Sequence, residues 1–191
     1  MNNLHKKYDG LIFDCDGTLV DSMPVHFIAW RETMAKYGIE FTEKRFYELG
    51  GVPVAEIIRI LAAEAGKTLD IFKVAEEKEA TFFNNIAQVQ AKEEVLAIAR
   101  LNRGKLPMAV ASGTEGWALK IQLNHIGAWD WFDAVVGSDS VKNHKPAPDV
   151  FLEAARRIAV DPAKCCAFED SDMGIRAARA AGMDVVDVRT F

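Results

Sequence analysis

Cysteine is scarce in this chain, basic residues are not in excess, and no long apolar run is present. The three cysteines, Cys15, Cys165 and Cys166, have no metal-ligand spacing, and their odd number is typical of reduced, mostly buried thiols. A formal net charge of −5 argues against a general nucleic-acid-binding protein. No apolar run approaches the roughly 20 residues that span a membrane, and residues 1–7 lack the apolar core of a signal peptide. We therefore expect a cytoplasmic protein that binds neither nucleic acid nor membranes.

A large apolar fraction is present instead, and it is arranged in short runs. Hydrophobic residues make up 50% of the 191 residues, enough for one well-packed domain and a smaller one. The runs after the first alternate with helical patterns, which indicates βαβ units and a parallel sheet. The sequence therefore predicts an α/β fold with a Rossmann-like parallel sheet flanked by helices. We expect strands at residues 10–13, 106–111, 134–136, 165–168 and 184–188, and helices at residues 116–126, 149–158 and 173–181.

Residues 20–91 interrupt this alternation, because they show no strand pattern and are far longer than an ordinary connection. Apolar residues recur there at helical spacing, and Ser22 is the expected N-cap of the first helix. We expect a helical cap domain of residues 20–91, inserted after the first strand of a catalytic core of residues 1–19 and 92–191. Such a cap can act as a lid, and the alternative is a helical layer packed on the sheet. The apolar stripes comprise Met23, Phe27, Trp30, Met34 and Tyr37; Val54, Ile57, Ile58 and Leu61; and Phe72, Ala75, Phe82, Phe83 and Ile86.

Two carboxylates, Asp14 and Asp16, follow the apolar run of residues 11–13. A buried strand does not ordinarily end in two acids, because each must be hydrated, paired or bound to a metal. Gly17 then permits a tight turn, and Thr18 can form a hydrogen bond within it. Since ligands bind at the strand ends of parallel sheets, this segment is a candidate site. A strand that ends in a solvated acidic turn is the alternative.

Two further segments place polar groups near expected strand ends. Ser112 and Gly113 follow the run of residues 106–111, where a hydroxyl and backbone N–H groups can cradle a phosphate. Lys145 precedes Pro146, which favours an extended loop that would hold one ammonium group in place. Each segment by itself has an ordinary alternative. The first can be a simple turn, and the second can be a loop with a surface lysine.

A second acidic cluster, Glu169 and Asp170, follows the apolar run of residues 165–168. Carboxylates at short range repel one another unless a cation or a proton separates them. Mg²⁺ suits such a site, because it needs few protein ligands and keeps water molecules for a phosphate. With that charge neutralised, Asp14 can attack phosphorus to form an aspartyl-phosphate, and Asp16 can transfer the protons.

The order of these motifs resembles that of the haloacid dehalogenase superfamily of phosphohydrolases. Residues 168–183 are similar to the branch that contains β-phosphoglucomutase and small sugar-phosphate phosphatases, especially the short bacterial phosphatases of fructose 1-phosphate or 6-phosphogluconate. The resemblance implies a Mg²⁺-dependent phosphatase that acts on a small phosphorylated sugar or sugar acid. In the roles that the resemblance implies, Asp14 is the nucleophile and a metal ligand, and Asp16 is the acid/base and binds the metal through its carbonyl. Ser112, Gly113 and the catalytic Lys145 bind the phosphoryl group. Glu169 and Asp170 bind the metal.

Other activities of this family remain open. A phosphosugar mutase is the main alternative, although residues 49–54 lack the arginine of the mutase cap loop and Arg59 lies later, in an expected helix. A dehalogenase would not need the second acidic cluster, and a phosphonate-cleaving enzyme would need a cap lysine such as Lys78. A degenerate, non-catalytic protein would not retain every site residue. We expect His26, Gly51 and Lys78 to contact the substrate, and we expect a monomer.

Overall fold

The computed structural model describes residues 4–49 and 52–191, and the chain divides into two compact units. One unit contains Met1–Asp21 and Gln90–Phe191, and the other contains Ser22–Val89. Each unit has an apolar cluster of its own. The role of the second unit as a cap stays a prediction.

The first unit is built on a five-stranded sheet in the order β5-β4-β1-β6-β7. All neighbouring strands are parallel, and β1 is central, with Phe13 paired to Val110 of β4 and to Phe168 of β6. Side chains 11–13 of β1 are fully buried, which explains the continuous apolar run. The predicted fold class is therefore confirmed. The strands are β1 Gly10–Phe13, β4 Met108–Ala111, β5 Ala134–Val136, β6 Cys165–Glu169 and β7 Asp184–Asp187.

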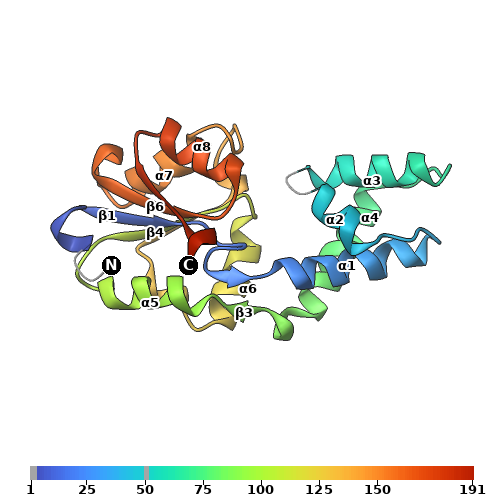
Figure 1. The fold of residues 1–191 in the computed structure, drawn as a ribbon, viewed down its shortest axis with the longest axis horizontal. Coiled ribbons are helices and arrows are strands. Elements are labelled where there is room, and N and C mark those ends of the chain that lie inside the picture. Colours follow the sequence, from blue (N-terminus) through green and yellow to red (C-terminus); the bar gives the residue numbers. More distant parts are fainter. Residues whose placement is uncertain (1–3, 50–51) are drawn as a thin grey trace. The chain divides into compact units, whose positions relative to one another are not determined.

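Helices cover both faces of this sheet, with α5 on one face and α7 and α8 on the other (Figure 1). The inner faces of α7 and α8 carry apolar residues that cluster with those of the strands. The predicted helices are present with ends that differ by one residue, whereas α5 was not predicted. The helices are α5 Glu93–Asn102, α6 Gly116–His125, α7 Asp149–Arg157 and α8 Asp172–Ala180.

The second unit consists of helices, and its apolar cluster includes the rings of Trp30, Phe41 and Phe46. Two of its helices begin with side-chain caps, because Thr42 accepts a hydrogen bond from the Arg45 amide and Asp70 accepts from two amides of its first turn. Ser22 occupies the expected N-cap position, but its side chain makes no capping hydrogen bond. The helices are α1 Met23–Lys36, α2 Glu43–Glu48, α3 Val54–Glu64 and α4 Ile71–Asn84.

Two details of residues 20–91 differ from the expectation. Strand β2, Val20–Asp21, pairs antiparallel with β3, Gln90–Ala91, so the prediction that this segment contains no strand is wrong at both ends. Phe72 was expected in a buried stripe, but its side chain is 89% exposed in the first turn of α4. Two-residue strands are too short to show a period in the sequence, and a single apolar residue at a helix start can face solvent.

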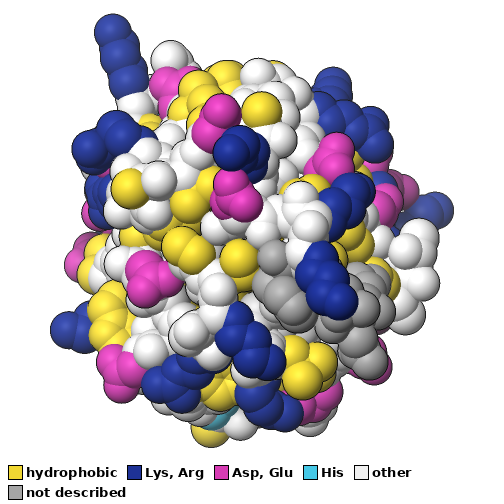
Figure 2. Space-filling view, turned by 90° about the vertical axis from the view of Figure 1, so that its left-hand side faces the viewer, with side chains coloured by type: hydrophobic (Ala, Val, Ile, Leu, Met, Phe, Trp, Pro, Cys, Tyr) yellow, Lys and Arg dark blue, Asp and Glu magenta, His cyan; other side chains and the backbone are white. Residues whose placement is uncertain are grey.

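The surface of the first unit mixes both charge signs. Figure 2 shows basic and acidic side chains distributed among apolar atoms on one face of the molecule. None of the helices within the described ranges is long and apolar enough to cross a lipid bilayer. All three cysteines are free and buried.

Candidate active site

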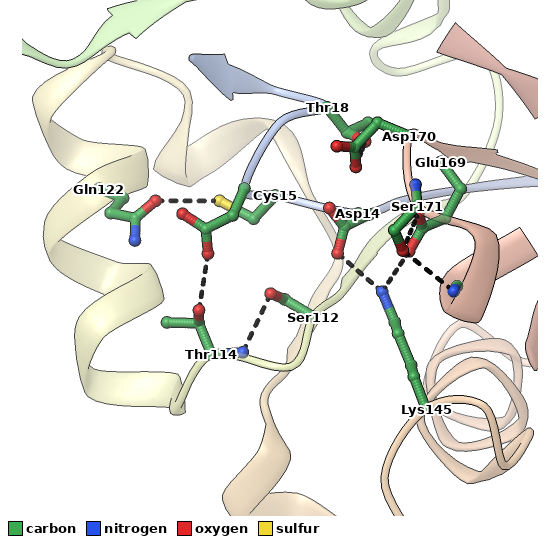
Figure 3. Close-up of polar contacts among 12 residues, drawn as sticks. Asp14, Cys15, Thr18, Ser112, Thr114, Gln122, Lys145, Glu169, Asp170 and Ser171 are labelled. Carbon is green, nitrogen blue, oxygen red and sulfur yellow. Dashed lines mark hydrogen bonds and ion pairs between the residues drawn. The ribbon is translucent and has the colours of Figure 1, made fainter. Parts of the chain in front are cut away.

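The carboxyl ends of three neighbouring strands bring the candidate residues together. Asp14 directly follows β1, Ser112 follows β4, and Glu169 is the last residue of β6 (Figure 3). Since β1 lies between β4 and β6, the side chain of Asp14 lies between polar groups from both neighbours. Lys145 reaches the same place from the loop before α7.

Lys145 forms a buried bridge between two acids. Its Nζ lies 2.7 Å from Oδ1 of Asp14 and 2.6 Å from Oε1 of Glu169. Burial alone would lower the pKa of Lys145, but the two carboxylates outweigh it and raise that pKa above its ordinary value. The lysine therefore stays charged, and it holds the Asp14 carboxylate in a fixed position.

Asp14, Glu169 and Asp170 form a group in which one carboxylate oxygen from each residue lies within 4.8 Å of the other two. Three carboxylates thus face the single ammonium of Lys145, which leaves an excess of two negative charges when all are ionised. Burial raises the pKa of Asp14 well above its usual range, Lys145 opposes this, and the other two acids reinforce it. Burial and then Glu169 likewise raise the pKa of Asp170. Because the donors are all oxygens and two negative charges remain unbalanced, the group fits a hard divalent cation such as Mg²⁺.

The turn after β1 places Asp170 beside this group. Three successive amides, from Thr18 to Val20, donate hydrogen bonds to the carbonyl of Cys15, so the chain folds back tightly. The hydroxyl of Thr18 then donates to Oδ1 of Asp170 at 3.1 Å. Gly17 has a φ of 84°, and a Cβ there would lie 2.1 Å from Oδ2 of Asp170. The Gly-Thr pair therefore both shapes the turn and makes room for the second acidic cluster.

Glu169 is oriented by the start of α8. Its Oε2 accepts hydrogen bonds from the amide of Ser171 at 2.7 Å and from the Ser171 hydroxyl at 3.0 Å. That hydroxyl also accepts from the amide of Gly174, as an N-cap does. A Cβ on Gly174 would lie only 1.6 Å from Oε1 of Glu169, so a side chain at this position would displace the carboxylate. Sequence reasoning did not assign this role to Ser171 or Gly174, although a glycine in an Ala-rich helix is a signal of a packing constraint.

Asp16 lies in the turn after β1, and its side chain contacts the loop after β4 and is not part of the acidic group. The hydroxyl of Thr114 donates to Oδ2 of Asp16 at 2.6 Å, and the amide of Thr114 donates to Oγ of Ser112 at 3.1 Å. Ser112 is buried and Gly113 is exposed, with no atom within 4 Å of the position where its Cβ would be. Thr114, like Ser171 and Gly174, was not among the predicted site residues, although it directly follows Ser112 and Gly113. The metal-ligand role of the Asp16 carbonyl stays a prediction.

In the second unit, two of the three expected substrate residues contact each other. Nζ of Lys78 lies 3.0 Å from Nδ1 of His26 and 2.8 Å from Oε1 of Glu79. The His26 ring stacks on Phe82, with ring centres 4.1 Å apart. Lys78 is only 3% exposed. No pattern in the sequence indicates that His26 and Lys78 are neighbours. The third expected residue, Gly51, lies outside the described residues.

Known proteins are similar to this chain over almost its whole length. Residues 11–188 match the family model of the haloacid dehalogenase-like hydrolases. The chain is 41% identical to the fructose-1-phosphate phosphatase YqaB of Escherichia coli over 186 residues, which cover 97% of this chain and 99% of that protein. It is 36% identical to the phosphorylated carbohydrates phosphatase of Thermotoga maritima, over 92% of this chain and 82% of that protein.

A solved structure agrees with this likeness. The crystal structure of β-phosphoglucomutase from Clostridium difficile superimposes with a TM-score of 0.78 at 28% identity, over 94% of this chain and 84% of that one. The match of the family model and the two relatives confirm the family that the motifs suggested. The chain belongs to the haloacid dehalogenase-like hydrolases.

Proposed function

We propose that this protein is a Mg²⁺-dependent phosphatase that hydrolyses a small sugar phosphate, such as fructose 1-phosphate or 6-phosphogluconate, through an aspartyl-phosphate. The observation that carries the proposal is the bridge from Lys145 to Asp14 and Glu169 inside a group of three carboxylates. A buried carboxylate held beside a fixed ammonium is suited to attack on a phosphoryl group. The names of the two relatives support a phosphorylated carbohydrate as the substrate.

The reaction takes two steps at Asp14. In the first, a carboxylate oxygen of Asp14 bonds to phosphorus, the bond from phosphorus to the sugar oxygen breaks, and that oxygen receives a proton from the carboxylic acid of Asp16. In the second, a water molecule bonds to phosphorus, Asp16 accepts the proton of that water, and the bond to Asp14 breaks. Inorganic phosphate leaves, and both side chains return to their first states.

The remaining groups bind charge. Side chains of Asp14, Glu169 and Asp170, with the carbonyl of Asp16, would hold Mg²⁺, which supplies positive charge for the phosphoryl oxygens when it is bound. The Ser112 hydroxyl, the backbone of the following glycine and the Lys145 ammonium would bind the phosphoryl group. In this scheme Lys145 opposes the negative charge that develops as phosphorus is transferred.

The sugar would contact the second unit through His26 and Lys78, whose ammonium and imidazole can bind hydroxyl or carboxylate groups. A phosphosugar mutase is the alternative, which the similarity to β-phosphoglucomutase keeps open. Arg59 does not support it, because this residue pairs with Glu56 at 2.9 Å within α3. A monomer in the cytoplasm remains our expectation.

The test is phosphate release from a panel of sugar phosphates, with and without Mg²⁺. We expect activity that is lost on chelation and restored by Mg²⁺, and Asp14→Asn should lower it by at least about 10³-fold, because the nucleophile is removed. Asp9→Asn is the matched control, since Asp9 precedes the other end of β1 and pairs with Lys164. Phosphate release that survives Asp14→Asn would refute the proposal. Faster conversion of glucose 1-phosphate to glucose 6-phosphate than release of phosphate, given a bisphosphate primer, would favour the mutase.

A further inference from the structure

Thr114 contacts the proposed acid/base residue directly, although the mechanism above gives it no role. Its hydroxyl donates to Oδ2 of Asp16 at 2.6 Å, a short distance that is typical of a hydrogen bond from a hydroxyl to a carboxylate. In Figure 3, Thr114 lies on the same loop as Ser112, on the side of Asp14 away from Lys145. The contact therefore joins the proton-transfer residue to the loop that would bind the phosphoryl group.

We propose that Thr114 is a positioning residue that orients the carboxyl group of Asp16 for proton transfer to the leaving sugar oxygen. This inference rests on the proposed phosphatase function. With Oδ2 accepting from Thr114, the transferred proton is carried by Oδ1 in the first step and returns to Oδ1 from water in the second. The hydroxyl of Thr114 donates in both steps, because Oδ2 is an acceptor in the acid and in the carboxylate alike.

The loop around Thr114 is held firmly enough to act in this way. The amide of Thr114 donates to Oγ of Ser112, and its carbonyl accepts from the amide of Ser138 at 3.0 Å. Two residues later, the amide of Gly116 donates to Oδ1 of Asp139 at 2.9 Å. Both backbone groups of Thr114 are thus fixed, and its β-branched side chain has few conformations to choose from.

A positioning role makes a prediction about leaving groups that a purely structural role does not. A sugar alkoxide is a poor leaving group and needs the proton of Asp16, whereas p-nitrophenolate leaves without one. Loss of the hydroxyl of Thr114 should therefore slow the cleavage of sugar phosphates selectively. The value of kcat/KM reports this first phosphoryl transfer for both kinds of ester.

The experiment compares Thr114→Val, which keeps the shape and removes the hydroxyl, with Thr114→Ser, which keeps the hydroxyl. We expect Thr114→Val to lower kcat/KM for a sugar phosphate by about 10- to 100-fold, mainly through kcat. The kcat/KM for p-nitrophenyl phosphate should change by less than about 3-fold, and Thr114→Ser should restore the wild-type values. Thermal melting of both variants checks that the loop is intact.

A double-mutant cycle with Asp16→Asn makes the test specific. If Thr114 acts only through Asp16, then Thr114→Val should cause little further loss in the Asp16→Asn protein. Equal losses on both esters, a full loss added to that of Asp16→Asn, or no loss at all would each overturn the inference. Failure of the underlying function is distinct, because the wild-type protein would then release phosphate from neither ester with Mg²⁺ present.

Discussion

Each unit of this protein contains a lysine whose side chain is almost enclosed, 11% exposed for Lys145 and 3% for Lys78, and the surroundings of the two differ in one respect. Lys145 in the first unit lies between two carboxylates whose side chains are 7% and 1% exposed. Lys78 in the second unit lies against an imidazole, against Glu79, whose side chain is 38% exposed, and near the rings of Trp30 and Phe82. One ammonium is thus enclosed by opposite charge, and the other mainly by neutral and aromatic groups.

These surroundings suit the two ammonium groups to different roles. An ammonium between two buried carboxylates orients them and is itself held still, which suits a group that must stay in place during a reaction. An ammonium beside one imidazole and one half-exposed acid retains hydrogen-bonding capacity for another molecule. We therefore expect substitutions at Lys145 to act on kcat and substitutions at Lys78 to act on KM.

Between the two lysines, the larger effect should follow removal of the Lys145 charge. Lys145→Met should lower kcat for a sugar phosphate by about 10²- to 10³-fold, because a fixed charge at the transferring phosphoryl group is lost. Steady-state kinetics with saturating Mg²⁺ measures this. Lys164→Met is the matched control, since Lys164 makes an exposed pair with Asp9 at 3.2 Å. If the two variants had the same kcat, the distinction between enclosed and exposed lysines would fail.

The acid on the other side of Lys145 can be displaced without removing it. Gly174→Ala should move the Glu169 carboxylate, because the new Cβ would lie 1.6 Å from Oε1. We expect the Mg²⁺ concentration for half-maximal activity to rise by about 10- to 100-fold, and titration calorimetry should show weaker Mg²⁺ binding. Ala180→Gly perturbs the exposed end of the same helix without touching Glu169, and it should leave both measurements unchanged. Unaltered Mg²⁺ binding in Gly174→Ala would contradict the placement of Glu169.

Lys78 should give a smaller and different effect. Lys78→Met should raise KM for the sugar phosphate by about 10-fold or more, since hydrogen bonds to a charged group contribute about 1.5–3 kcal/mol. The kcat, and the kinetics with p-nitrophenyl phosphate, should change little. Lys73→Met is the control on the exposed side of α4. If Lys78→Met lowered kcat alone and left KM unchanged, the two lysines would not differ in role.

The smallest effect is expected at a surface site that reverses the charges of the Lys145 site, because there one acid lies between two arginines. Glu153 accepts from Arg156 at 2.7 Å and from Arg157 at 2.8 Å, and these hydrogen bonds lower its pKa from 4.5 to about 2. The lowered pKa makes the pairs stabilising above pH 4.5, and this contribution is lost as the pH falls toward 2. Because the arginines are solvated, Glu153→Gln should cost less than about 1 kcal/mol of unfolding free energy at pH 7.

Urea denaturation at pH 7 and at pH 3 would measure this contribution. The difference between wild type and Glu153→Gln should shrink at the lower pH. A cost at pH 7 as large as that of breaking a buried pair, about 3–5 kcal/mol, would show that enclosure matters less than the number of charged partners.

The sequence predicted the first unit better than the second one, for a physical reason. Strand β1 was predicted with its observed ends because residues 11–13 are buried on both faces, and burial forces a continuous apolar run. Strands β2 and β3 have two residues each, and include Asp21 and Gln90, so no such pattern forms. Phe72 fits the helical spacing of apolar residues, yet it faces solvent, so spacing alone does not identify it as exposed.

The same limit applies within the site. Asp14, Lys145 and Glu169 were predicted as site residues because charged residues at strand ends or beside a proline are unusual in themselves. Thr114, Ser171 and Gly174 are ordinary turn and cap residues in the sequence, and only the fold reveals which carboxylate each one contacts. The meeting of His26 with Lys78 depends on the packing of α1 against α4, which no local pattern encodes.

The short pairing of β2 with β3 affects how the segment between them can change in evolution. Asp21 pairs with Gln90, so the residues that lead into and out of the segment Ser22–Val89 are neighbours. A segment with adjacent ends can be lengthened, shortened or exchanged at a small cost in closure entropy, without re-threading the parallel sheet. The groups proposed for catalysis and the groups proposed to contact the sugar can therefore change independently in evolution. A chimera that joins this sheet to the inserted segment of a relative is a practical route to a new substrate range.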